Sequence, residues 1–197
     1  MGGSFRESLP FGWRICKLKE IAELTMGQSP KSNTYNSERV GLPLINGAAE
    51  LQKQGISIEK YTSAPARVCR IGDILFCIRA TLGNVQFANR EYCLGRGVAA
   101  LRPKKDIYRE YVYLAIRDYL DAVASNLSGS IIVGLSKEDI EDLSIPLPPL
   151  EELKSFSEAV SPMVDKIYRN RDEAIQIAKA RDDFFPLFIN GQIRVFD

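Results

Sequence analysis

Histidine is absent from all 197 residues of this chain. Its absence removes the Ser-His and Cys-His pairs of nucleophilic catalysis and the side chain that most often serves as a general base near neutral pH. The four cysteines, Cys16, Cys69, Cys77 and Cys93, are scattered without a C-x-x-C pair. Because zinc sites need clustered Cys or His ligands, we expect no metal site and interpret the cysteines as small buried hydrophobes.

The motifs of several enzyme classes are missing as well. The sequence has no P-loop, no glycine-rich cofactor turn and no Asn/Asp-Pro-Pro-aromatic loop of the kind that methyltransferases use for a flipped base. We therefore expect no catalytic residues and no cofactor. No window of 18 or more apolar residues occurs, and the first six residues lack a signal-peptide core, so we expect no membrane partner and a cytoplasmic location.

Charge is nearly balanced overall, at +1, but it is unevenly distributed. Residues 1–105 contain 16 Lys and Arg against 8 Asp and Glu, whereas residues 106–197 contain 10 against 17. The front part therefore carries +8 and the rear part −7. A basic part beside an acidic part indicates two surfaces with two kinds of partner, and the basic part suits a polyanion.

The first hundred residues are rich in strand signals. Short apolar or alternating runs, bounded by Gly, Pro and Asn, predict strands at residues 14–18, 42–47, 56–58, 74–79 and 92–102. After Pro103 a 3.6-residue apolar period predicts a helix over residues 106–126. Ser136 and Asp139 have the spacing of a capping box and predict a further helix start. The fold class is therefore α+β: a β-rich domain with a few helices.

A long helix is predicted after the proline-rich turn at residues 145–150. Its apolar residues recur every seven positions, as in a coiled-coil seam. The predicted seam residues are Leu153, Val160, Ile167, Ala174 and Ile177. The seam predicts pairing with another helix, although a terminal helix folded back on its own domain is an equal alternative. Ser161-Pro162 fits a helix start better than a helix interior, so a short helix, a jog and a longer helix are also possible.

Several segments, in order, resemble the specificity subunit of type I restriction-modification systems. They include Leu9-Pro10-x-Gly12-Trp13, Gly27-Gln28-Ser29-Pro30, Gly72-Asp73-Ile74-Leu75, Gly95-Arg96-Gly97, the block Leu143 to Glu152, and the ending Arg181 to Ile193. That family's usual chain alternates two target recognition domains with two helical arms, whereas this sequence has one of each. The resemblance implies a recognition domain over 1–147 and a dimerisation and spacer arm over 148–197.

The resemblance also implies a function. It implies a non-catalytic subunit that reads double-stranded DNA and docks a methyltransferase subunit and, through it, a restriction subunit. It further implies a homodimer whose arms form an antiparallel coiled coil, so that a two-fold protein reads a two-part site. The alternative, favoured by the acidic rear part, is a scaffold or inhibitor that binds such subunits without reading DNA.

Candidate DNA contacts are polar side chains able to bond base edges and cations able to bond phosphates. They are Gln28, Lys31, Ser32, Tyr35, Asn36, Arg39, Arg79, Thr81, Arg96, Ser128 and Ser130. Position-fixing phosphate contacts are expected at Arg67, Arg70, Arg102, Lys104 and Lys105. Simpler interpretations remain open: a solvated loop at residues 28–39, an Arg79–Asp73 ion pair, glycines that serve only close packing around Arg96, and a plain turn at residues 128–130.

Overall fold

A computed structural model describes residues 9–52, 54–79, 84–126 and 134–193. Its centre is a four-stranded antiparallel sheet in the order β2-β11-β8-β9. These strands are β2 (Ala22–Met26), β8 (Ile74–Cys77), β9 (Val85–Phe87) and β11 (Val98–Pro103). The strands predicted at residues 74–79 and 92–102 are confirmed, although a turn at residues 95–97 divides the second into β10 and β11.

A second four-stranded sheet has the order β10-β4-β7-β3, and its β10–β4 pair is parallel. Its strands are β3 (Tyr35–Asn36), β4 (Leu42–Ile45), β7 (Tyr61–Thr62) and β10 (Cys93–Leu94). Two short antiparallel pairs complete the strands: β1 (Arg14–Lys17) with β12 (Ser144–Leu147), and β5 (Leu51–Gln52) with β6 (Gly55–Ile56).

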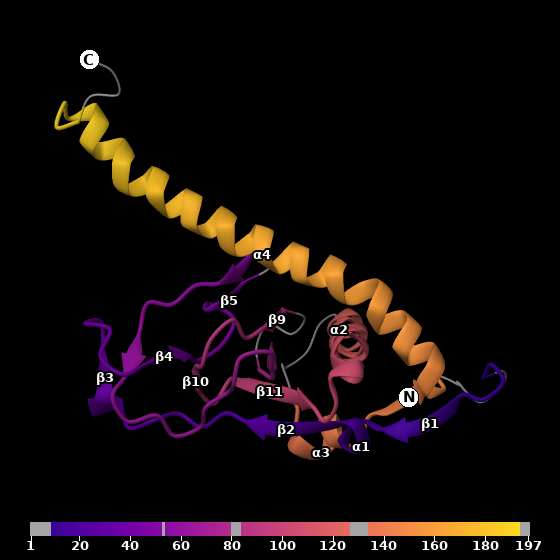
Figure 1. Cartoon of the computed structure of the whole chain (residues 1–197). Helices are drawn as coiled ribbons and strands as arrows, with labels where there is room; N and C mark the ends of the chain where they lie inside the picture. Colours follow the sequence, from indigo (N-terminus) through magenta and orange to yellow (C-terminus); the bar gives the residue numbers. More distant parts are fainter. Residues whose placement is uncertain (1–8, 53, 80–83, 127–133, 194–197) are drawn as a thin grey trace.

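The helices lie mainly around the central sheet and along one side of the molecule (Figure 1). They are α1 (Leu18–Ile21), the 3-10 turns η1 (Ser32–Thr34) and η2 (Asp106–Tyr108), α2 (Arg109–Asn126), α3 (Lys137–Glu141) and α4 (Leu150–Ile189). The helix predicted at residues 106–126 is confirmed as η2 followed by α2. The α+β class is also confirmed.

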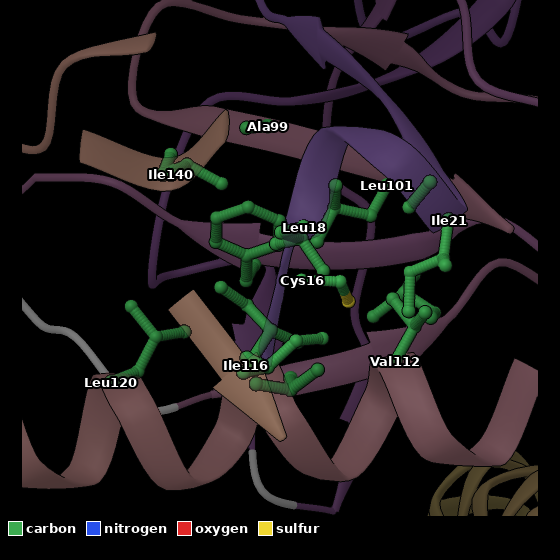
Figure 2. Close-up of a cluster of buried hydrophobic side chains, with 14 of the residues drawn as sticks. Cys16, Leu18, Ile21, Ala99, Leu101, Val112, Ile116, Leu120 and Ile140 are labelled. Atoms are coloured by element: carbon green, nitrogen blue, oxygen red, sulfur yellow. The ribbon is translucent and has the colours of Figure 1, made fainter. Parts of the chain in front are cut away.

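The central sheet is buried on both faces because its side chains alternate between two cores. On β8, Ile74 and Phe76 belong to one core, whereas Leu75 and Cys77 belong to the other. Figure 2 shows the first core, where Leu18, Leu101, Val112 and Ile116 come together from α1, β11 and α2. The second core contains Ile45 and Leu94 of the second sheet.

The long helix α4 is continuous over 40 residues, with Pro162 and Pro186 inside it. The predicted jog at Ser161-Pro162 is therefore wrong. Pro162 removes one backbone hydrogen bond, but Leu153 before it and Val164 and Tyr168 after it pack on the same core. Packing on both sides of the proline outweighs a local cost of about 3 kcal/mol.

The first part of α4 lies against its own domain, and its last part extends beyond the sheets (Figure 1). Arg109 of α2 donates to Asp165 at 2.8 Å, and the side-chain amide of Asn89 donates to Asp172 at 3.2 Å. The ring of Tyr168 meets Phe87 edge-on, with centroids 5.1 Å apart. The alternative of a helix folded on its own domain thus holds for this first part, and the boundary between residues 147 and 148 stays a prediction.

Candidate nucleic-acid interface

Three chain segments meet where β2, β8 and β10 end and β11 begins. The Gly27 amide donates to the Val98 carbonyl at 2.9 Å, and the Gln28 amide donates to the Leu94 carbonyl at 2.8 Å. A Cβ at Gly27 would collide with the Gly95 carbonyl oxygen, and one at Gly95 would collide with Asn46. Only glycine permits this approach, which gathers loops from both sheets at one edge of the domain.

A recess of about 700 Å³ opens at this edge, and two arginines line it. Its lining consists of Met26, Gly27, Ile78, Arg79, Arg96, Gly134, Leu135 and Ser136. Arg79 and Arg96 are both exposed, and neither forms an ion pair with any residue that the structure describes. We call this feature the arginine recess. Two unneutralised guanidiniums in one concave surface favour an anionic ligand.

The helix α3 shapes one wall of the arginine recess. Ser136 accepts a hydrogen bond from the Asp139 amide at 3.1 Å, and Asp139 accepts one from the Ser136 amide at 2.9 Å. The predicted capping box is therefore confirmed. The Ser136 hydroxyl also donates to the Asp139 carboxylate at 2.7 Å. This bond, and after it the one from the Ser136 amide, holds the pKa of Asp139 below its ordinary value. The capping box fixes the backbone conformation at Ser136, which lines the arginine recess together with Arg79 and Arg96.

The predicted alternatives for Arg79 and Arg96 are now separated. Asp73 does not pair with Arg79, because it is buried and holds Arg102 instead, at 2.7 Å. The glycines around Arg96 do serve close packing against Asn46, yet the Arg96 side chain stays exposed. Arg102, where a phosphate contact is predicted, has its guanidinium paired with Asp73 inside the domain, and the phosphate contact stays a prediction.

The polar segment of residues 28–39 runs from the edge of the arginine recess into η1 and β3. Gln28, Lys31, Ser32 and Arg39 are exposed, and Tyr35 is half-buried. The side chain of Asn36 is already engaged: it donates to the Val40 carbonyl at 2.9 Å and accepts from the Val40 amide at 3.0 Å. Asn36 therefore braces the turn that follows it with one N–H and one lone pair of its amide group, and its predicted base contact stays a prediction.

The structure brings Gln28, Arg79 and Arg96 to one edge, with Lys31, Ser32, Tyr35 and Arg39 on the segment that leaves it. Thr81, Ser128 and Ser130 lie outside the described residues. Sequence reasoning missed Met26 and Leu135 as lining residues, because an isolated apolar residue beside a loop carries no signal of exposure. Gly27 was visible as part of a motif, but its partner Gly95 is 68 residues away and only the fold joins them.

The predicted seam residues of α4 divide into two groups. Leu153 is buried in the core of its own chain, so it belongs to that core and not to a surface open to a second copy. Val160 is half-buried, while Ile167, Ala174 and Ile177 are exposed. Ile167 is 48% exposed and Ile177 62% exposed.

Within the described part of the chain, no group of three or more His, Cys, Asp or Glu residues could hold a metal ion. All four cysteines are free and buried, and burial raises the pKa of both Cys69 and Cys77 to about 12. Among the same residues, no helix is both long and apolar enough to cross a membrane.

Comparison with known proteins identifies the family. The profile of the type I restriction modification DNA specificity domain matches residues 10–177. The chain belongs to this family. It is 33% identical over 199 residues to a putative type I restriction enzyme MjaX specificity subunit of Methanocaldococcus jannaschii, covering 98% of this chain and 47% of that protein. It thus spans about half the length of this specificity subunit.

Solved structures from type I restriction-modification systems share the fold. The HsdS subunit from Thermoanaerobacter tengcongensis is 38% identical with a TM-score of 0.62, covering 83% of this chain and 41% of that one. A chain from a structural study of type I R-M complex assembly and conformational transition is 34% identical with a TM-score of 0.66, covering 90% of this chain and 44% of its own length.

Proposed function

We propose that this specificity-domain chain is a non-catalytic DNA sequence reader that works as a homodimer. Each copy presents one arginine recess and one polar segment, residues 28–39, to duplex DNA. Base edges are read by polar and guanidinium groups, and phosphates are bound by exposed cations. The observation that carries this proposal is the pair of exposed, unneutralised arginines, Arg79 and Arg96, in one recess of a chain that belongs to this family.

The length of α4 supports the homodimer. The 40 residues of this helix extend about 60 Å at 1.5 Å per residue. Two such helices, antiparallel about a two-fold axis, hold two recognition domains more than one DNA turn of about 34–36 Å apart. A two-fold protein of this size fits a two-part, inversely repeated site.

The partners of the dimer are a type I methyltransferase subunit and, through it, a restriction subunit, in the cytoplasm. Methyl transfer, ATP use and cleavage belong to these partners. This division of labour agrees with the lack of histidine and of cofactor motifs in the sequence.

Selection from a library of random duplexes tests the proposal. The purified protein, alone and with its methyltransferase subunit, should enrich one two-part sequence. Binding should weaken steeply with salt, with a slope set by the number of phosphates covered. The double variant Arg79→Ala/Arg96→Ala should lose the enrichment. Arg117→Ala removes a similar charge from α2, outside the arginine recess, and should keep it.

Two results would reject the proposal. One is a library that stays random with and without the methyltransferase. The other is a dimer that binds the methyltransferase but has no affinity for duplex at low salt, which would favour the scaffold or inhibitor alternative.

A further inference from the structure

The helix α4 carries two separate apolar faces. The inner face, which includes Leu153, Val164 and Tyr168, packs on the domain. The outer face contains Met163, Ile167, Ala174, Ile177, Phe184 and Phe188, which are all exposed. At about 100° per residue, the two faces are roughly a third of a turn apart. The outer face is therefore free for a helix that does not displace the domain.

The outer face has the spacing of a coiled-coil seam, and two opposite charges flank it on one side. Positions 160, 167, 174 and 181 form one line and positions 163, 170, 177 and 184 the other, and all are apolar except Asn170 and Arg181. Lys166 and Glu173 each precede a residue of the first line and are exposed. Neither forms an ion pair with any described residue. Flanking charges of this kind set partner choice and register.

Two antiparallel copies of α4 can pair only in registers that differ by one heptad. The two-fold axis exchanges the two helices, so the flanking positions of one helix face the same flanking positions of the other. Three registers give substantial overlap of the seam. They set Lys166 against Lys166 of the second copy, Lys166 against Glu173, or Glu173 against Glu173. Only the middle register pairs opposite charges, and symmetry supplies that pair twice, whereas the outer two repel.

The ends of α4 favour the same register. In the middle register Leu150, at the start of one helix, lies beside Phe185 and Leu187 near the end of the other. Leu150 is 57% exposed and Phe185 is 62% exposed, so both have apolar surface to cover. A shift of one heptad in one direction sets Leu150 against residue 194, beyond the end of α4. A shift in the other direction sets Phe184 against residue 146, before α4 begins.

We propose that two copies of α4 pair antiparallel in the single register that sets Lys166 against Glu173 of the second copy, with the Phe184–Ile189 tip of each helix covering the base of the other at Leu150. The proposal rests on the homodimer of the proposed function and adds its register and its end contacts. Phe11, which is fully exposed, lies next to this base, since Gly12 approaches Pro149. The tip of one arm therefore reaches the recognition domain of the other copy.

Disulfide cross-linking distinguishes the three registers. The native cysteines are buried, so introduced cysteines report without background. In the proposed register the double variant Lys166→Cys/Glu173→Cys should form covalent dimers under mild oxidation, and each single variant should not. Cross-linking of Glu173→Cys alone, or of Lys166→Cys alone, would overturn the register and leave the dimer standing. A monomeric mass for the wild-type protein by light scattering would overturn the dimer itself.

A charge exchange gives a second, independent test. Lys166→Glu and Glu173→Lys should each raise the dimer dissociation constant about tenfold, because each turns two attractive pairs into repulsive ones. The double exchange should restore the wild-type value. Glu158→Lys and Lys179→Glu, at exposed positions of α4 away from the outer face, serve as controls and should change little. Failure of the double exchange to restore dimerisation would contradict the proposed pairing.

Discussion

The carboxylate of Asp73 meets the guanidinium of Arg102 in a two-point contact, with Nε to Oδ1 at 2.8 Å and Nη2 to Oδ2 at 2.7 Å. Asp73 also accepts the backbone amide of Arg70 at 2.8 Å, so one buried side chain joins the turn before β8 to β11. The Asp73 hydrogen bonds raise the pKa of Arg102 above its ordinary value. This arginine is therefore paired within the domain, whereas Arg79 and Arg96 form no ion pair with any described residue.

Replacing Asp73 with alanine should lower the free energy of unfolding by about 3 kcal/mol, because the change leaves Arg102 without its buried partner and the Arg70 amide without its acceptor. Chemical denaturation would measure the loss. Arg70→Ala keeps the amide and removes an exposed side chain, so it should cost less than about 0.5 kcal/mol. Equal stabilities for the two variants would show that the contact is unimportant.

Arg79→Ala should relax sequence choice in duplex binding, whereas Lys31→Ala should weaken binding to all duplexes about equally. A guanidinium in a recess can bond two acceptors of a guanine, while an exposed lysine meets phosphate as a point charge. The expected loss of discrimination for Arg79→Ala is about 1–3 kcal/mol. Binding to matched and mismatched duplexes at fixed salt would measure it. The reverse pattern would exchange the two roles.

Tyr168→Phe should leave stability unchanged or raise it by about 1 kcal/mol. The Tyr168 hydroxyl is buried near the Tyr113 hydroxyl and the Phe87 backbone but forms no well-aligned hydrogen bond with a described residue, which carries a desolvation cost. Thermal unfolding of Tyr168→Phe and Tyr168→Ala would separate hydroxyl from ring, because the alanine also loses the edge contact with Phe87. A clear destabilisation by phenylalanine would indicate that the hydroxyl has a partner in solution.

The same residue predicts a pH dependence. Burial raises the pKa of Tyr168, so the folded chain keeps the phenol proton that the unfolded chain loses near pH 10. Stability should therefore fall as pH rises above about 10, where the unfolded state binds fewer protons than the folded one. Unfolding measured between pH 8 and about 11 should show a smaller fall for Tyr168→Phe than for the wild type.

The native thiols should resist modification. With a pKa of about 12, Cys69 and Cys77 hold only ~1 in 10,000 of their thiols as thiolate at pH 8. A chromogenic disulfide reagent should react with all four cysteines in denaturant and with almost none in the folded protein. Rapid native reaction of one equivalent would identify a cysteine that opens locally.

Ile167→Asp should convert dimers into monomers without loss of helix content. Ile167 is exposed on the outer face of α4, so a carboxylate there harms pairing but not the domain. Light scattering measures the mass and circular dichroism the helix content. Ile175→Asp provides a matched contrast, because Ile175 lies near Gly55 on the inner face and its change should instead affect the stability of the chain. An unchanged mass for Ile167→Asp would place the dimer contact elsewhere.

Local signals in the sequence predicted much of this fold. Ser136 and Asp139 predict a helix start because the side chain of each accepts a hydrogen bond from the backbone amide of the other, within four residues. The helix at residues 106–126 follows from its own apolar period. Pairings between distant segments had no such signal: β1 meets β12 across about 130 residues, and β4 lies parallel to β10. The continuity of α4 through Pro162 was likewise set by packing against the domain.

The residue types of the candidate site could be predicted from the sequence. Which of these side chains are already bonded to other residues of the fold could not. Arg79, Arg96 and Arg102 look alike in sequence, yet only the fold assigns Arg102 to buried Asp73. Asn36 has the chemistry of an adenine-reading residue, but the turn after it uses both ends of its amide. Whether a polar side chain already has a partner depends on residues that are distant in sequence and close only in the folded chain.

The pairing of β1 with β12 joins the first described strand of the chain to the last strand before α4. The chain between β1 and β12 therefore begins and ends at nearly the same place, next to the start of α4. A different segment could therefore replace the one between β1 and β12 without altering α4 or its pairing with a second copy. Under the proposed function, exchange of the one continuous gene segment between these strands would change the DNA sequence that the protein reads.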